Sequence, residues 1–284
     1  MERNWKLILL ILGILLILNV LVWIQALSDK GVSEAVYFID VGQGDSSLIV
    51  FESGEKVLID GGRDGRVLLE ELDKVLNDSD RYIDLVILSH GHFDHYGGLI
   101  ELMKNYEIGA FLSSGRIGEA EAYGQLQTEI ERRKIKFLNL AEGDSLQFSG
   151  ANIEVLSPSA REILSEDVNL ASLVLLLDLQ PGNVIFTGDI DKNVEKRLIK
   201  DYEVLDVDVL KVAHQGSKYS SDINFLAQVS PALSVIMVGP NTYGHPHKET
   251  LDNLSPISEV VRTDEKGTMK LEAQNGEFML YSVK

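Results

Sequence analysis

The sequence contains no cysteine, and this absence removes one kind of chemistry at the outset. Disulfide bonds and thiolate zinc sites are excluded, so histidine and carboxylate side chains are the only strong metal ligands that the chain offers. The absence does not identify a cellular compartment. A metal site in this protein therefore has to be sought among its histidines and acidic residues.

Basic residues are scarce: 26 Lys and Arg stand against 44 Asp and Glu, and the formal net charge is −18. Proteins that hold nucleic acid by neutralising its phosphates usually present a basic surface. The composition therefore argues against a strong basic nucleic-acid surface, and it slightly favours small substrates over long duplex DNA. A small basic cleft, or a metal ion that recruits phosphate, is still compatible with it. The hydrophobic content of 45% is that of a globular protein.

Charge is absent from residues 7–27, an apolar run near the N-terminus. About 20 apolar residues suffice to cross a membrane as a helix, so we expect an anchor over residues 1–28 and a linker over 29–34. The basic residues Arg3 and Lys6 precede the run, which favours a single-pass topology with a cytoplasmic N-terminus and an extracytoplasmic domain.

The alternative for the same run is a cleaved signal peptide, which would leave a secreted protein if residues 1–26 were removed. Under either interpretation, the remainder of the chain lies outside the cytoplasmic membrane. Trp5 and Trp23 are the only tryptophans in the chain, and they are spaced so that each would occupy one interfacial belt of a membrane.

Residues 35–284 are expected to form one α/β domain. Short β-branched or aromatic runs predict strands over residues 35–40, 47–51, 56–60, 84–89, 172–179, 183–187, 207–213, 232–238, 269–273 and 278–282. Helical periodicity predicts helices over residues 66–77, 99–104 and 120–133. Strands that alternate with helices, and that meander near both ends, predict two sheets sandwiched between helices.

The six histidines are grouped rather than scattered. His90, His92 and His95 share the segment SHGHFDHYGG with Asp94, directly after an apolar strand and before a predicted helix. The carboxyl end of a strand is a usual place for a ligand site in α/β folds. We expect His90 and His92 to reach one metal ion, and Asp94 and His95 to face a second, with Gly91, Gly97 and Gly98 allowing the backbone to turn tightly.

Further polar residues follow other predicted strands. Asp189 is placed to bridge two ions, although it could equally be the N-cap of a helix that begins near Lys192. His214 follows the strand over residues 207–213, and Asp60 is placed to accept a hydrogen bond from a ligand histidine. Together these residues predict a dinuclear site on one rim of the sandwich.

The H-x-H-x-D-H segment, the T-G-D sequence ending at Asp189 and the later His214 resemble the metallo-β-lactamase superfamily, an αββα sandwich with one or two metals at its rim. More narrowly, the segments IDVGQGDSSLIV, VLIDGG, NLASLVLLL, FTGDI, LKVAHQGSKYSS and YGHPH are similar to the hydrolase domain of the ComEC-type competence family. ComEC-type proteins also carry a polytopic channel and an OB-like domain, which this sequence lacks, so it is not expected to form a DNA-uptake pore.

The resemblance implies roles for individual residues. The first metal would be held by His90, His92 and Asp189, and the second by Asp94, His95, Asp189 and His214. Asn169 stands where many superfamily members place a further histidine, which would leave the first metal an open position. Gln215 stands where the family usually has a second histidine, so the contact which that residue makes is in doubt.

Two divalent ions are thus expected, with zinc favoured and manganese or iron as alternatives. The favoured function is a phosphodiesterase or nuclease that uses a metal-activated water held by Asp94 and Asp189. The alternatives are an ester, lactone or lactam hydrolase and a non-catalytic metal-binding surface protein. DNA and smaller phosphodiesters are both candidate substrates, and the sequence leaves the oligomeric state open.

A leaving oxygen also needs a proton or a nearby positive charge. The candidates that supply it, or that contact substrate, are His245, His247, Lys211, Lys218, Ser217 and Ser220. His245 is the favoured proton donor. The two serines are expected either to bind phosphate or only to shape the turn after His214.

Overall fold

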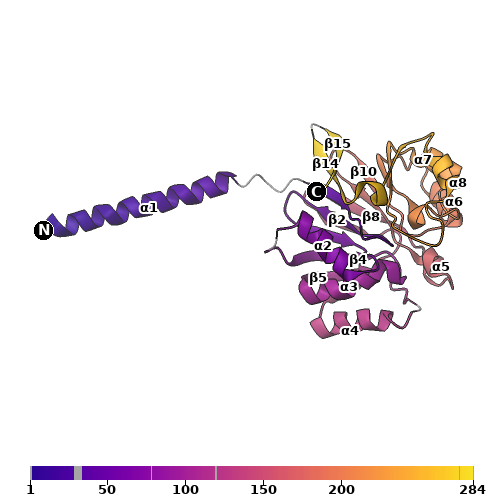
Figure 1. Ribbon diagram of the computed structural model, residues 1–284, viewed down its shortest axis with the longest axis horizontal. Helices are drawn as coiled ribbons and strands as arrows, with labels where there is room; N and C mark the ends of the chain where they lie inside the picture. Colours follow the sequence, from indigo (N-terminus) through magenta and orange to yellow (C-terminus); the bar gives the residue numbers. More distant parts are fainter. Residues whose placement is uncertain (1, 29–33, 78, 119, 275, 284) are drawn as a thin grey trace.

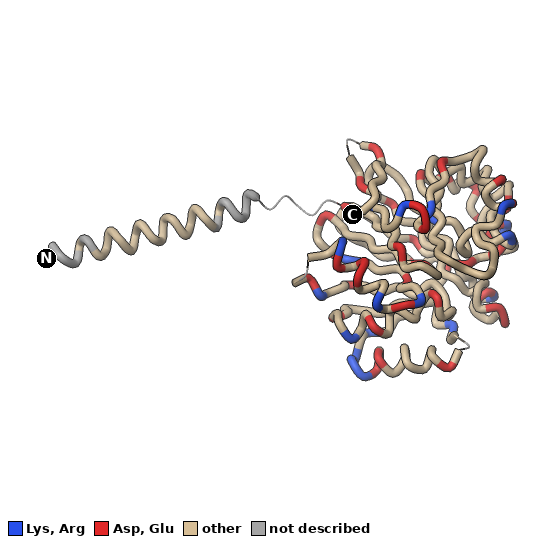
Figure 2. The backbone as a smooth tube through the Cα atoms, in the orientation of Figure 1, with Lys and Arg blue, Asp and Glu red and all other residues tan. Residues whose placement is uncertain are grey.

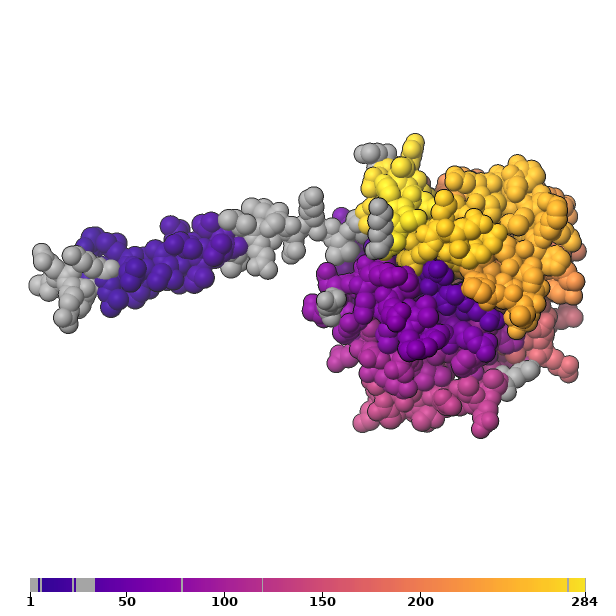
Figure 3. All heavy atoms as spheres, in the orientation of Figure 1, coloured from indigo at the N-terminus to yellow at the C-terminus, as the bar shows by residue number. Residues whose placement is uncertain are grey.

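The computed structural model describes residues 2–28, 34–77, 79–118, 120–274 and 276–283. Within these ranges the domain consists of two β-sheets packed face to face, with helices on both outer faces (Figure 1). The predicted αββα sandwich is therefore confirmed. The N-terminal half of the chain builds one sheet and its helices, and most of the remainder builds the other, so the two halves lie side by side in Figure 3.

The first sheet has eight strands among the described residues, in the order β15-β14-β1-β2-β3-β4-β5-β6. These strands are β1 (Ala35–Phe38), β2 (Ser47–Val50), β3 (Lys56–Ile59), β4 (Tyr82–Leu88), β5 (Glu107–Ser113), β6 (Lys136–Asn139), β14 (Met269–Gln274) and β15 (Glu277–Ser282). The pairs from β15 to β3 are antiparallel, whereas β3 to β6 run parallel. The parallel strands β3 and β4 therefore end at the same edge of the sheet.

The second sheet has seven strands in the described part of the chain, in the order β13-β12-β11-β10-β9-β8-β7. They are β7 (Ser145–Phe148), β8 (Ala151–Ser157), β9 (Val174–Asp178), β10 (Asn183–Phe186), β11 (Val209–Lys211), β12 (Leu233–Ile236) and β13 (Glu259–Arg262). Here β7 to β10 pair antiparallel, and β10 to β13 pair in parallel. Each sheet thus combines an antiparallel meander with a parallel half.

Helices cover the two outer faces. The first sheet is covered by α2 (Gly65–Val75), α3 (Phe93–Asn105) and α4 (Tyr123–Arg133), and the second by α6 (Lys192–Asp201), α7 (Ile223–Val229) and α8 (Lys248–Leu254). The short helices are α5 (Ala160–Ile163), α9 (Thr263–Lys266) and the 3-10 turns η1 (Val168–Ala171) and η2 (Ala213–Gly216). Each covering helix buries an apolar stripe against its sheet, which places the connecting loops at the rims.

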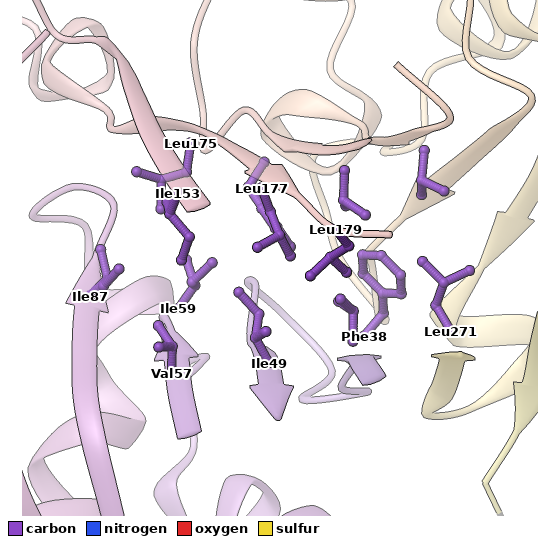
Figure 4. Packing of buried hydrophobic residues seen from close by; sticks show 14 of the residues in the cluster. Phe38, Ile49, Val57, Ile59, Ile87, Ile153, Leu175, Leu177, Leu179 and Leu271 are labelled. Carbon is purple, nitrogen blue, oxygen red and sulfur yellow. The ribbon is translucent and has the colours of Figure 1, made fainter. Parts of the chain in front are cut away.

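The main core lies between the two sheets. Figure 4 shows side chains of the first sheet, including Phe38, Ile49 and Ile59, opposite Leu175 and Leu177 of the second. All five belong to one buried cluster, and four of the five have no exposed surface. Alternate residues of each strand point into this layer, as expected for sheets packed face to face. The core fixes the two sheets relative to each other, and with them the loops at their shared rim.

The N-terminal apolar run forms the helix α1 (Glu2–Ser28). Among the residues that the structure describes, no helix is both long enough and apolar enough to cross a membrane. The predicted membrane anchor and single-pass topology are therefore not supported.

The two tryptophans of the N-terminal helix lie among the described residues, whereas most of the predicted linker does not. The side chains of Trp5 and Trp23 are exposed, and residues 7–21 of α1 carry no charge in Figure 2. The predicted linker over residues 29–34 lies outside the described residues except for its last position. On the domain itself, segments with basic and acidic residues are interspersed in the same view.

Candidate metal centre

The segment that runs from the end of β4 into the first turn of α3 carries four of the predicted ligands. β4 ends at Leu88, His90 and His92 lie in the loop, and α3 begins at Phe93. Asp94 and His95 therefore belong to the first turn of α3, and the prediction that the helix begins near residue 99 was wrong. A carboxylate in the first turn interacts favourably with the positive end of the helix dipole, so Asp94 also suits the helix start.

The glycines of this segment have a different role from the one expected. Gly97 and Gly98 lie inside α3, where they do not make a turn. A Cβ atom at Gly98 would lie 2.0 Å from the carbonyl oxygen of Gly61, so only glycine lets α3 approach the loop after β3 this closely. Gly91 makes a similar close approach, to Gly118. Gly97 and Gly98 therefore bring the helix that carries His95 against the segment that follows β3.

Three imidazole nitrogens converge on one carboxylate oxygen. Asp189 Oδ2 lies 3.4 Å from His95 Nε2, and 3.7 Å from the Nε2 atoms of both His90 and His214. His90 Nε2 also lies 3.2 Å from His92 Nδ1. The first sheet supplies His90, His92 and His95, and the second supplies Asp189 and His214. Side chains from both halves of the domain thus meet at one point.

The unsatisfied atoms of this cluster test whether a metal ion fits. His95 Nε2 and Asp189 Oδ1 are buried and have no hydrogen-bond partner among the described residues. Buried polar groups are normally paired, and leaving them unpaired costs free energy. His90, His92 and Asp189 also offer ligand atoms that all lie within 4.8 Å of one another. Imidazole and carboxylate donors in this arrangement suit a divalent cation such as zinc.

The electrostatics of His90 and Asp189 are consistent with that use. Burial, together with the neighbouring His95, holds the pKa of His90 well below its usual value, so the His90 ring is neutral. Burial would raise the pKa of Asp189, but His95, His214 and His90 outweigh it and hold that pKa well below its usual value. A neutral imidazole and an ionised carboxylate are the forms that bind a metal ion.

Asp60 orients His95 from the side away from the cluster. Its Oδ2 lies 2.8 Å from His95 Nδ1, and its two carboxylate oxygens accept hydrogen bonds from the Ser89 backbone N–H at 2.8 Å and the Ser89 hydroxyl at 2.6 Å. The hydrogen bond predicted between Asp60 and a ligand histidine is thus present, and the histidine is His95. With Nδ1 donating to Asp60, Nε2 is left as the metal-binding nitrogen.

Asp189 is not a helix cap. The N-cap of α6 is Asp191, whose side chain accepts hydrogen bonds from the backbone N–H groups of Asn193 and Val194. Asp189 lies two residues earlier, it is 2% exposed, and its backbone N–H donates to Ser172 Oγ at 3.3 Å. Asp191, and not Asp189, therefore caps the helix, and the Asp189 carboxylate faces the histidines.

The turn after β11 has an unusual backbone that presents His214. Both His214 and Gln215 have positive φ, at 51° and 54°, a conformation that non-glycine residues adopt rarely. The turn points the buried Gln215 side chain back into the site, where its Nε2 donates a hydrogen bond to Asp94 Oδ2 at 3.0 Å. Gln215 is therefore in contact with a predicted ligand, Asp94, and this is the contact that the residue makes in place of the family's usual histidine.

Asn169 and Ser217 line the cavity over the cluster, whereas Ser220 does not. Asn169 lines the cavity above the cluster, and its buried Oδ1 has no partner in the described part of the chain. Ser220 is buried and donates to the carbonyl oxygens of Ala213 and Ser217, so it shapes the turn. Ser217 lines the cavity, and its hydroxyl oxygen accepts the Tyr219 N–H at 3.3 Å.

Comparison with known proteins establishes the family. The family model described as "Metallo-beta-lactamase superfamily" matches residues 39–239. The chain belongs to this superfamily. Similarity to solved structures is consistent with it: the metal-dependent hydrolase Tm1679 of the beta-lactamase superfamily has a TM-score of 0.56 and 15% identity, over 85% of this chain and all of that one. At that identity the likeness shows the fold alone.

Two curated relatives confirm the narrower resemblance to the competence family. The chain is 32% identical over 276 residues to ComE operon protein 3 of Bacillus subtilis, covering 90% of this chain and 35% of that protein. It is 29% identical over 220 residues to Recombination protein 2 of Haemophilus influenzae, covering 76% of this chain and 26% of that protein. The chain thus spans about a third of the length of these relatives, or less.

A cavity of about 660 Å³ lies over the metal centre of this superfamily member. Besides predicted residues such as His245, it is lined by residues that the sequence analysis did not single out: Gln43, Arg63, Phe93, Tyr219 and Tyr243. Arg63 lies over the ring of Phe93, with its guanidinium carbon 5.4 Å from the ring centroid. Gln43 lies within the segment IDVGQGDSSLIV and Arg63 directly follows VLIDGG, so their position in or beside these segments was the available signal.

His245 and His247 both reach this cavity. The His245 ring packs edge-on against His214, with ring centroids 5.4 Å apart, and its buried Nδ1 has no partner among the described residues. Burial, reinforced by His214, lowers the pKa of His245, so the ring is neutral in the free protein. His247 is anchored by its backbone N–H, which donates to the Gly216 carbonyl oxygen at 2.8 Å.

Lys211 does not contact this cavity, which corrects the prediction that it supplies positive charge to a leaving group. Lys211 is buried, and its side chain forms an ion pair with the buried Asp45. Lys211 is the last residue of β11, and its side chain points between the sheets rather than to the rim. Lys218, in contrast, lines the cavity, with Nζ 5.1 Å from the centroid of the Tyr219 ring.

Proposed function

We propose that this protein is a metal-dependent phosphodiesterase. The observation that carries the proposal is the lining of the cavity over the metal centre, where Arg63 and Lys218 lie with the histidine and aspartate cluster. In a chain of net charge −18, two cationic side chains at the cluster mark a place for an anionic substrate. A phosphodiester matches this site, because its negative charge suits the two cationic side chains and its electrophilic phosphorus suits a metal-activated water.

The cluster suits two divalent cations, which would be held by His90, His92 and Asp189 on one side and by Asp94, His95, Asp189 and His214 on the other. Such ions lower the pKa of a bound water and polarise a phosphoryl oxygen. The protein's own contribution is to hold the ligands ready: Asp60 fixes the His95 ring, and Gln215 fixes the Asp94 carboxylate.

The remaining cavity residues act on the substrate itself. Arg63 and Lys218 bind the phosphate oxygens, and each is stacked on an aromatic ring that restricts its movement. His245 is neutral in the free protein and takes up a proton as negative charge gathers beside it, which equips it to protonate a leaving oxygen. Asn169 offers an unpaired amide oxygen to the same space.

The substrate class has further support from the aromatic rings of the cavity. Phe93, Tyr219 and Tyr243 line it together with the cations, and aromatic rings stack well on nucleic-acid bases. One relative is named for recombination, a process that acts on DNA. Single-stranded DNA and smaller phosphodiesters with an aromatic leaving group are therefore the first substrates to test.

The full-length chain, loaded with zinc or manganese, tests the proposal. We expect hydrolysis of bis-p-nitrophenyl phosphate, with a loss of at least about 100-fold in kcat/KM for Asp189→Ala and His90→Ala because each removes a metal ligand. Asp191→Ala is the matched control: it removes a helix cap worth about 1 kcal/mol and leaves the cluster intact, so its activity stays near that of the wild type.

The other arms of the assay separate the alternatives. Activity on a lactone or on nitrocefin without activity on the phosphodiester would overturn the proposal in favour of an ester, lactone or lactam hydrolase. A folded, metal-loaded protein that is inert on the phosphodiester, single-stranded DNA, the lactone and nitrocefin would favour a metal-binding surface protein.

A further inference from the structure

A buried ion pair lies behind the metal centre and joins the two sheets. Lys211 is the last residue of β11 in the second sheet, and Asp45 precedes β2 in the first. Their side chains are 3% and 5% exposed, and Lys211 Nζ donates to Asp45 Oδ2. The two residues are 166 positions apart in the chain. This pair therefore connects the two halves that supply the ligands.

On the second sheet, Lys211 is connected to two predicted ligands through one carbonyl group. Lys211 Nζ donates to the Gly188 carbonyl oxygen at 3.0 Å, and the backbone N–H of His214 donates to the same oxygen at 3.0 Å. Gly188 directly precedes Asp189. The position of this carbonyl group therefore fixes two things at once: the peptide that leads into Asp189 and the backbone of His214.

On the first sheet, Asp45 is connected to the segment that supports His95. The Asp45 carbonyl oxygen accepts the Gly62 N–H at 2.9 Å, and the Gly61 N–H donates to the His95 carbonyl oxygen at 2.7 Å. The carboxylates of Asp45 and Asp60 and a ring nitrogen of His95 also lie within 4.8 Å of one another. Asp45 thus contacts the segment that holds His95. Its partner Lys211 contacts the carbonyl group that positions Asp189 and His214.

We propose that the Asp45–Lys211 ion pair is a positioning device for the metal centre, which holds the Asp189 and His214 ligands of one sheet in register with the His95 ligand of the other. Neither residue belongs to the ligand set, and neither lines the substrate cavity. The proposal rests on the proposed function only in requiring that the site holds metal ions.

Energetic considerations favour positioning over simple stabilisation. Desolvating two charges costs free energy that their attraction often fails to return, so a buried ion pair is frequently replaced by apolar residues without loss of stability. An apolar pair at positions 45 and 211 would continue the core between the sheets, but it would remove the Lys211 donor and leave the Gly188 carbonyl oxygen with the His214 N–H alone. The ion pair is therefore better explained by the placement of that group than by the stability of the fold.

The test compares metal affinity with stability in four variants of the full-length chain. Asp45→Asn preserves the shape of the side chain and removes its charge, whereas Lys211→Met removes the donor to Gly188. The double variant Asp45→Leu/Lys211→Met replaces the pair by apolar side chains. Arg197→Met is the matched control, because it breaks the ion pair with Glu162 elsewhere in the second half of the domain. For each protein, Tm is measured without metal and Kd for Zn²⁺ by chelator competition.

We expect Asp45→Asn and Lys211→Met to raise the Kd for Zn²⁺ by at least about 10-fold, the usual effect of removing a residue that orients a ligand. The double variant is expected to recover most of the Tm lost in Lys211→Met while its Kd stays at least about 10-fold raised. The visible spectrum of the Co²⁺-loaded Asp45→Asn protein should also change, because the ligand geometry changes. Arg197→Met should lower Tm without altering Kd.

A double variant that recovers Tm and wild-type Kd together would overturn the proposal, since the pair would then act only on stability. A folded Asp45→Asn protein with wild-type Kd and an unchanged Co²⁺ spectrum would overturn it as well. Failure of the proposed function gives a different result: the wild-type chain would bind no metal, or would bind it without hydrolysing a phosphodiester.

Discussion

Gln215 Nε2 donates a hydrogen bond to Asp94 Oδ2 at 3.0 Å, which joins the turn after β11 to the first turn of α3. The two residues are 121 positions apart, and they lie in segments that follow strands of different sheets, β4 and β11. The contact occupies one carboxylate oxygen of Asp94. In the proposed ligand set, Gln215 would thus orient Asp94 as Asp60 would orient His95.

Replacing Gln215 by leucine should weaken metal binding. The change removes the hydrogen bond that orients Asp94, and such losses usually cost 10- to 100-fold in metal affinity, so we expect the Kd of the more weakly bound Zn²⁺ to rise by about 10-fold. Isothermal titration calorimetry of the metal-free protein measures it. Gln147→Leu, at an exposed position on β7, is the control. Equal affinities in Gln215→Leu and the wild type would show that this contact does not support a ligand.

Arg63→Met and Lys218→Met should mainly affect substrate binding. Each removes a charged hydrogen-bond donor to phosphate, which is worth about 1.5–3 kcal/mol, or roughly 10- to 100-fold in kcat/KM. Metal content should be unchanged, because neither side chain is a ligand. Steady-state kinetics on bis-p-nitrophenyl phosphate, with metal content determined on the same samples, check this prediction. Variants that lose metal, or that retain full kcat/KM, would contradict the role assigned to the two cations.

Glu195 should make stability depend on pH. The side chain is 1% exposed on α6, and its two oxygens accept the backbone N–H groups of Ser221 at 2.6 Å and Asp222 at 2.8 Å. Burial raises the pKa of Glu195 from 4.5 to about 7, although these two hydrogen bonds and the charge of Lys192 oppose the rise and the charge of Asp222 adds to it.

Because the folded state binds this proton more tightly, the contribution of Glu195 to stability is full below pH 4.5 and is lost as pH rises to about 7. The loss is on the order of 3 kcal/mol. Urea unfolding of the metal-free protein at pH 5 and pH 8 measures it, and Glu195→Gln should show a smaller difference between the two. Identical pH dependence in the two proteins would exclude Glu195 as its source.

The sequence predicted the architecture because the strands that build the core are short apolar runs at the expected spacing. It missed β5 to β8 and β13, and for β5, β6 and β7 the structure shows a physical reason. Glycine interrupts the apolar pattern of β5 at Gly109, where a Cβ atom would lie 2.5 Å from the Asp84 carbonyl oxygen. β6 and β7 lie at sheet edges and expose half or more of their residues, so no buried pattern marks them.

The start of α3 was misplaced for a related reason. Two consecutive glycines, Gly97 and Gly98, have low helix propensity, and the sequence alone therefore favours a turn. The structure places them in the helix because close packing against Gly61 and the segment after β3 outweighs that propensity. The clustering of the histidines was visible in the sequence, whereas the distances between them depend on this packing.

The supporting contacts of the site were the least predictable part. Lys211 has the sequence context of a residue at a strand end near His214, which suggested that it faces substrate. Its actual partner, Asp45, lies 166 positions away and is brought to it only by the packing of the two sheets. The cavity residues Arg63 and Tyr243 likewise come together with Lys218 only in the folded domain.

The most direct test of the account is the metal content of the purified full-length chain, measured by plasma mass spectrometry after zinc loading and removal of free metal. We predict two ions per wild-type chain, fewer than one in Asp189→Asn because the shared carboxylate is lost, and two in Asp191→Asn, which keeps its capping oxygen. A wild-type chain that retains no zinc, or an Asp189→Asn chain that still holds two ions, would contradict it.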